Sequence, residues 1–213
     1  MNIFPNTESV QTMLSNQKIY AFENLLMSTG REGINKVIEF LRNTDFYSAP
    51  ASSKFHSNYT GGLLDHSIKV YILANKYRDV IVSEKPDLTE RLKDESIIIS
   101  SLLHDICKTC FYVQTEKWKK DSSSNWIQYV GYEVNDTFPI GHGEKSVIML
   151  QNIGLTLTTD EMLAIRYHMG MYSEQNGELK QAQFAAAQMS PLVPLLQMAD
   201  FTASSMMEPT YKF

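Results

Sequence analysis

Six potential metal ligands stand in apolar or glycine-flanked stretches of this 213-residue chain. They comprise four of its five histidines and two aspartates: His66, His104, Asp105, His142, His168 and Asp200. Charged groups are rarely buried without a partner or a metal ion. Asp105 and Asp200 both fall on helix faces that should be buried, so the histidines are their natural neighbours. A lone inward histidine is more often a hydrogen-bonded core residue, but the joint pattern favours a shared metal centre.

Helices from different parts of the chain must bring these residues together. The apolar periodicity predicts helices over 31–44, 63–82, 94–109, 144–152, 181–189 and 192–206, and a capping box at Thr158–Glu161 predicts another that ends near Met169. A bundle of these helices could converge the six side chains at its centre. Consecutive His104 and Asp105 differ by about 100° around a helix axis, yet both could reach one cluster. The Asp105 carboxylate could bridge two ions.

The ordered set, carried by GGLLDHS, LLHDICK and GHGEKS, resembles the HD-domain superfamily of metal-dependent phosphohydrolases. The resemblance covers residues 54–203. It is most similar to the HD module of bacterial HD-type 3′–5′ exoribonucleases and to related small HD hydrolases. It implies an all-α HD-domain bundle with a metal centre in its core. The implied common ligands are His66, His104, Asp105 and Asp200, and His142 and His168 match the further histidines of two-metal members.

The resemblance also implies an activity. We expect a phosphomonoesterase or phosphodiesterase that acts on a nucleotide, a dinucleotide or a short oligonucleotide end. Two divalent transition-metal ions, bridged by Asp105, would activate a bridging hydroxide. The nitrogen and oxygen ligands suit Mn, Fe, Ni, Co or Zn without choosing among them.

Two further residues are candidates for contacts with the substrate. Lys108 matches the lysine of the HDxxK pattern, which approaches substrate phosphate in the family, so the expected catalytic residues are Asp105 and Lys108. A solvated lysine at a helix end is the alternative. His56, in KFHSNYTGG, could contact a phosphate or donate a proton, and an ordinary loop histidine is an equal alternative.

Several features of the sequence argue against particular functions of the family. Cys107 stands where the family often has glycine, and a larger side chain there would narrow the cleft; the Cys107–Cys110 pair is interpreted as incidental. The chain has no GYP signature, which argues against cyclic-di-GMP hydrolysis of that subtype. The net charge of −5 argues against an extensive nucleic-acid interface. The length leaves no room for the OB domain of the exoribonucleases.

Two other functional classes stay open. Some HD-fold proteins are oxygenases that hold a di-iron pair with this same ligand set. A non-catalytic HD module that binds a nucleotide is the other alternative, although degenerate HD proteins usually lose ligands and this chain keeps all six. The sequence determines neither the substrate, nor the metal, nor the oligomeric state.

The remaining segments complete the expected architecture. Residues 111–134 are rich in aromatic and β-branched residues around the polar turn KKDSSSN, which predicts a β-hairpin insertion. The hairpin would serve as a lid, as an edge of the cleft or as surface decoration. Residues 1–44 would form a helical extension packed on an HD domain of residues 45–213. The start MNIFPNTESVQ lacks a signal-peptide pattern, and no apolar run reaches the length of a membrane span, so we expect a cytoplasmic protein without a membrane partner.

Overall fold

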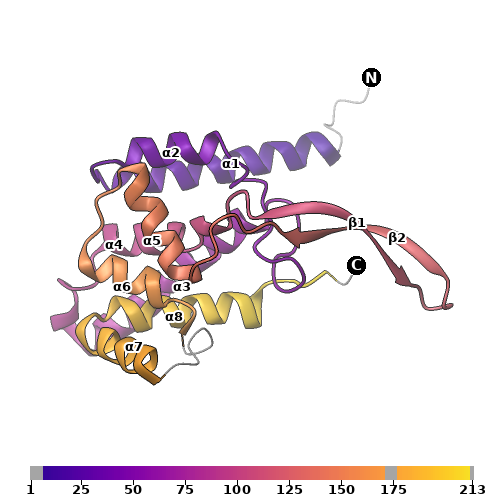
Figure 1. Ribbon diagram of the computed structural model, residues 1–213. Coiled ribbons are helices and arrows are strands. Elements are labelled where there is room, and N and C mark those ends of the chain that lie inside the picture. The colour runs from indigo at the N-terminus through magenta and orange to yellow at the C-terminus, as the bar shows by residue number, and fades with distance from the viewer. Residues whose placement is uncertain (1–6, 171–176, 212–213) are drawn as a thin grey trace.

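The computed structural model describes residues 7–170 and 177–211, with side chains described from Ser15 onward. Within these residues the chain is mostly helical, with one two-stranded antiparallel hairpin (Figure 1). The expected helical fold with a hairpin insertion is thereby confirmed. The α-helices are α1 (Thr7–Ser28), α2 (Ile34–Arg42), α3 (Gly62–Glu84), α4 (Asp94–Leu103), α5 (His142–Ile153), α6 (Thr159–Tyr167), α7 (Gly177–Met189) and α8 (Leu192–Thr202).

One hydrophobic cluster joins α1 and α2 to the first turn of α3, to α4 and to α5. Phe22 and Leu26 of α1 and Leu41 of α2 are fully buried there, together with Leu102 of α4. Burying such side chains is worth roughly 1.5–3 kcal/mol each. Helices α1 and α2 therefore pack on the helical body. The division of the chain at residue 45 stays a prediction.

A second cluster joins α3 to α6 and α8. These two helices lie on the side of the molecule away from α1 and α2 (Figure 1). Val70 of α3, Ala164 of α6 and Leu196 of α8 are buried in it. Because α3 contributes to both clusters, its first two turns lie where the two halves of the molecule meet. His66 is on this part of α3.

Helices α4 and α8 end earlier than their periodicity indicates. The helix expected over 94–109 stops at Leu103, and a short 3₁₀ turn, Ile106–Lys108 (η2), follows. Asp105 leaves helical geometry, with φ −106° and ψ 19°. This sparsely allowed bridge region often holds active-site residues. The helix expected over 192–206 stops at Thr202 and continues as a π-helical turn, Ala203–Met207 (η4).

The hairpin consists of β1 (Tyr112–Lys120) and β2 (Trp126–Val134). Tyr112 is paired with Val134 at its base and Lys120 with Trp126 at its far end. It projects away from the helical body (Figure 1). Among the helices that the structure describes, none combines the length and the hydropathy that crossing a membrane requires.

Candidate metal centre

A close backbone approach sets the position of His66 relative to the loop before it. A Cβ atom at Gly62 would lie 1.9 Å from the carbonyl oxygen of Ser57. Only glycine permits this approach without a shift of the backbone. The loop that carries His56 is thereby packed against the first turn of α3, four residues before His66.

A second glycine brings two further histidines together. A Cβ atom at Gly143 would lie 2.2 Å from the carbonyl oxygen of Arg166. The start of α5, with His142, therefore packs closely on the end of α6, where His168 is the C-cap. The capping box expected at the start of α6 is present, with reciprocal hydrogen bonds between Thr158 and Glu161.

The first half of the centre surrounds one oxygen of Asp105. The Nε2 atoms of His66 and His104 each lie 3.4 Å from Asp105 Oδ2. Asp200 Oδ1 lies 3.2 Å from His66 Nε2, and the two histidine Nε2 atoms are 3.1 Å apart. Four potential ligand atoms, from α3, α8 and the end of α4, therefore lie close together around Asp105 Oδ2.

The other oxygen of Asp105 faces the remaining two histidines. His142 Nε2 lies 3.1 Å from Asp105 Oδ1, and His168 Nε2 lies 3.5 Å from it. The carboxylate therefore stands between two groups of histidines, each facing a different oxygen. All six residues expected as ligands lie together, although they come from five separate segments of the chain, with His104 and Asp105 sharing the end of α4.

The donor atoms of the centre fit a bound cation. Asp105 Oδ1 and His168 Nε2 are fully buried, and neither has a hydrogen-bond partner of acceptable geometry among the residues described. Such atoms are costly to bury unless something binds them. The Nδ1–H groups of His104 and His168 donate to the carbonyls of Ser101 and Ile165, at 2.9 and 2.7 Å. A backbone acceptor at Nδ1 is typical of metal-binding histidines, whose Nε2 then carries the free lone pair.

Excess negative charge dominates the electrostatics of the centre. Burial by itself raises the pKa of Asp105, but the Lys108 ammonium and the His104 ring outweigh it and hold that pKa well below 3.8. Burial likewise opposes ionisation of Asp200, yet His66 lowers its pKa to about 2. For His66, burial favours the neutral ring, but its carboxylate neighbours raise the pKa well above 6.5. The carboxylates that stabilise a protonated His66 would also stabilise a metal cation in the same place.

Lys108 lies beside Asp105. Its Nζ is 2.6 Å from Asp105 Oδ2. Residues three positions apart lie on the same side of a 3₁₀ turn, so η2 brings the two side chains together. Burial lowers the pKa of Lys108, but the charge of Asp105 outweighs this and raises it, so the ammonium persists. The alternative of a solvated lysine at a helix end is wrong, since Lys108 is buried.

An open cavity of ≈ 820 Å³ leads to the centre. Its floor holds ionisable groups: Asp105, Lys108, His142, His168 and Asp200. Its walls are largely apolar and come from separate elements: Phe55, Tyr112, Met169, Met198 and Phe201. His56 also lines the cavity. A charged floor under apolar walls is suited to a ligand with a polar group on a hydrophobic body.

Most of the aromatic residues of the hairpin lie away from this cavity. Among the hairpin residues described, Tyr112 alone lines it. Trp118 and Trp126 are 60% and 64% exposed. Lys120 Nζ lies 5.5 Å from the centroid of the Trp126 ring, a cation–π contact between paired strands. These contacts favour cross-strand packing as the role of Trp126.

The two cysteines differ in environment. Cys110 is exposed and Cys107 is buried, and both are free thiols. Burial raises the pKa of Cys107 to about 12, so its thiol is neutral at pH 7. Its Sγ lies 3.4 Å from His142 Nδ1, and a neutral thiol at that place fills space beside a candidate ligand.

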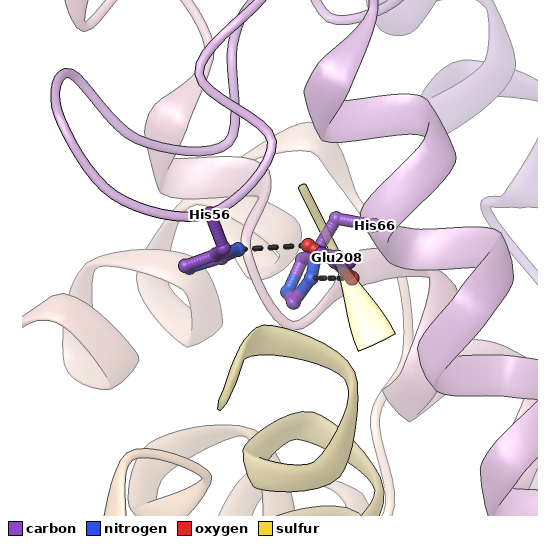
Figure 2. Close-up of side chains that lie close together, drawn as sticks. All are labelled: His56, His66 and Glu208. Atoms are coloured by element: carbon purple, nitrogen blue, oxygen red, sulfur yellow. Dashed lines mark hydrogen bonds and ion pairs between the residues drawn. The ribbon is translucent and has the colours of Figure 1, made fainter. Parts of the chain in front are cut away.

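One residue of the site was not anticipated from the sequence. Glu208 lies beyond η4, and its carboxylate contacts both His56 and His66 (Figure 2). It stands in MEPTYKF, where no periodic pattern marks its neighbours. Its pairing with residues far back in the chain is a product of the tertiary fold.

Comparison with known proteins gives one partial similarity. The chain is 39% identical over 93 residues to dihydroneopterin 2′,3′-cyclic phosphate phosphodiesterase of Methanocaldococcus jannaschii. The match covers 38% of this chain and 36% of that protein, so the chain spans about a third of the length of its curated relative. No family model matches the chain, and no solved structure matches it.

Proposed function

We propose that this chain is an HD-domain, metal-dependent phosphohydrolase whose substrate is a small phosphate ester. The observation that carries the proposal is the placement of Asp105, whose two oxygens face two separate groups of histidines. One carboxylate between two nitrogen-rich groups is the arrangement that a two-metal centre requires. The similarity to a phosphodiesterase supports the same class of reaction.

The proposed ligands divide into two groups around Asp105. His66, His104 and Asp200 share its Oδ2 side, and His142 and His168 share its Oδ1 side. When bound, two divalent transition-metal ions would supply a water nucleophile that is deprotonated at neutral pH and would neutralise charge on the phosphoryl oxygens. The imidazole and carboxylate donors suit Mn, Fe, Ni, Co or Zn.

The remaining polar groups of the cavity hold and protonate the substrate. Lys108 is a permanent cation on the floor, so it would bind a phosphoryl oxygen and stabilise the charge that develops there. His56 lines the same cavity and donates its Nδ1–H to Glu208 at 2.8 Å. When the ring carries a second proton, its Nε2–H would donate to the phosphate or give that proton to the leaving oxygen.

The apolar walls indicate the rest of the substrate. Phe55 and Phe201 are 72% and 52% exposed at the cavity, where a flat heterocycle could stack on them. A nucleotide, a dinucleotide or an oligonucleotide end has such a ring beside a phosphate. The name of the curated relative adds a 2′,3′-cyclic phosphate on a pterin to these candidates. We therefore propose a heterocyclic phosphodiester or monoester as the substrate class.

Elemental mass spectrometry of the purified protein tests the proposed centre. We expect two equivalents of transition metal per chain. If the metal is manganese, cobalt, nickel or zinc, the next experiment is a hydrolysis assay with 2′,3′-cyclic nucleotides, nucleoside monophosphates and dinucleotides. If the metal is iron and the protein consumes oxygen without releasing phosphate, the protein is a di-iron oxygenase and the proposed hydrolase function is wrong. Absence of metal after reconstitution, with nucleotide still bound, would leave a binding module.

The variant Asp105→Asn is the sharpest mutational test. It keeps the shape of the side chain but removes the charge that both groups of histidines share. We expect less than about 1% of the wild-type rate and at most one metal equivalent. Full activity and two equivalents in this variant would contradict the proposed mechanism.

A further inference from the structure

The C-terminal strap, Glu208–Tyr211, lies against the loop that precedes α3. Ser57 N–H donates to the carbonyl of Pro209 at 2.8 Å. The side chain of Asn58 exchanges two hydrogen bonds with the backbone of Tyr211, each of 2.8 Å. These three bonds hold the strap in one register on the loop, so the direction of the Glu208 side chain is set by the fold.

The Glu208 carboxylate is shared between two histidines (Figure 2). Its Oε1 accepts from His66 Nδ1–H at 2.8 Å. Its Oε2 accepts from His56 Nδ1–H and from the Ser57 hydroxyl, each at 2.8 Å. The side chain is only 3% exposed. A buried carboxylate with three donors is fully engaged, and charge-assisted bonds of this kind are strong.

These bonds determine which nitrogen of each ring is free. With Nδ1–H of His66 held by Glu208, the lone pair of a neutral ring lies on Nε2, which is 3.2 Å from Asp200 and 3.4 Å from Asp105. The same constraint acts on His56, which lines the cavity. One carboxylate thus sets the tautomer of a proposed metal ligand and the orientation of a proposed substrate contact.

We propose that Glu208 is a positioning residue that couples the metal centre to the substrate side of the cavity through His66 and His56. The inference rests on the proposed function, because it takes His66 as a metal ligand. His56, His66 and Glu208 also lie close enough to be considered as a separate metal site. Their ring nitrogens meet the carboxylate at hydrogen-bond distance, so the bonds already use the atoms that such a site would need.

Titration of metal-stripped protein with Co²⁺ tests the role of Glu208. We expect Glu208→Ala to weaken the affinity for one Co²⁺ equivalent by about 10- to 100-fold, as is typical when such a partner of a metal-binding histidine is removed. Glu208→Gln keeps the shape but replaces one acceptor oxygen with an N–H donor. It should therefore weaken binding as well, and Glu208→Asp should restore part of it.

The matched control is Asn58→Ala, which removes the two bonds between the loop and Tyr211 but leaves the Glu208 carboxylate in place. Thermal unfolding of all variants reports the structural contribution of the strap. We expect Asn58→Ala to lower the melting temperature and to weaken Co²⁺ affinity far less than Glu208→Ala does, because the Ser57–Pro209 bond and the three bonds of the Glu208 carboxylate remain. Unchanged Co²⁺ affinity in both Glu208→Ala and Glu208→Gln would overturn the inference. A third Co²⁺ equivalent in the wild type that disappears in Glu208→Ala would also overturn it, since Glu208 would then be a ligand.

Hydrolysis assays with the same proteins separate this inference from the proposed function. A wild type that binds two Co²⁺ ions tightly, but hydrolyses none of the phosphate esters, would contradict the function and leave the role of Glu208 to be decided by the affinities. A wild type that is active, with variants that bind Co²⁺ normally, would contradict only the role of Glu208. A wild type that binds neither Co²⁺, Mn²⁺ nor Zn²⁺ would overturn both.

Discussion

Lys108 Nζ lies 2.6 Å from Asp105 Oδ2, and the two side chains form a buried ion pair at the floor of the cavity. The lysine side chain is 8% exposed and the aspartate 2%. An ammonium has three donors, so Lys108 can hold Asp105 and still bind an oxygen of a substrate phosphate. The pair therefore links the proposed metal centre to the proposed phosphate site.

Replacing Lys108 tests this link. We expect Lys108→Ala to lower kcat/KM for phosphate esters by about 100-fold, because a fixed cation that stabilises transition-state charge is worth about this much. Two metal equivalents should remain, since Lys108 is not a ligand. Lys108→Arg keeps the charge and should retain more activity than the alanine variant. If the alanine variant is fully active, Lys108 has a structural role only.

The apolar wall can be tested at Phe55, which is exposed on a loop and should tolerate truncation. We expect Phe55→Ala to raise KM for esters with a heterocyclic ring by about tenfold, since stacking on one ring is worth ~1–3 kcal/mol. The kcat should change little. Phe184→Ala, at an equally exposed position on α7 outside the cavity, is the control. Equal effects of the two substitutions would argue against a ring-binding wall.

The hairpin offers a test of the lid interpretation. Trp126 lies at the far end of the strands and contacts Lys120, whereas Tyr112 at the base lines the cavity. We expect Trp126→Ser to leave kcat/KM within about twofold of the wild type, and Tyr112→Ala to lower it. Steady-state assays at several substrate concentrations decide this. A large loss in Trp126→Ser would show that the far end of the hairpin closes over the substrate.

The Glu23–Arg42 pair predicts a pH dependence of stability away from the site. Arg42 makes two hydrogen bonds to Glu23, and Tyr47 adds a third. The Arg42 hydrogen bond, aided by Tyr47, holds the pKa of Glu23 below its ordinary value of 4.5, although burial opposes this. A lowered folded-state pKa stabilises the fold above about pH 4.5, and this contribution is lost as the pH falls through the folded value.

Glu23→Gln should therefore lower the free energy of unfolding by up to about 1 kcal/mol at pH 7, because Arg42 is largely exposed and solvent screens the pair. The difference from the wild type should shrink below about pH 4.5, where the wild-type carboxyl becomes protonated. Urea unfolding across this pH range measures it. Glu39→Gln, at an exposed position on α2, is the control and should stay within about 0.5 kcal/mol. A difference that persists unchanged at low pH would contradict the assignment.

The sequence by itself was sufficient for the local elements. Helical periodicity predicted most of the helices, the capping box predicted the start of α6, and the aromatic run predicted the hairpin. These features depend on residues a few positions apart, whose interactions are the same in any fold. The identity of the candidate ligands was also readable, because histidine and aspartate in apolar stretches need partners when they are buried.

The arrangement of atoms at the centre was decided by the tertiary structure. Periodicity extended α4 through Asp105, whereas packing ends the helix at Leu103 and turns the carboxylate between the two groups of histidines. The bond between His66 and Glu208 joins residues 142 positions apart. Local patterns carry no information on such pairs, because hydrogen bonds and close backbone approaches between distant segments exist only once the helices have packed.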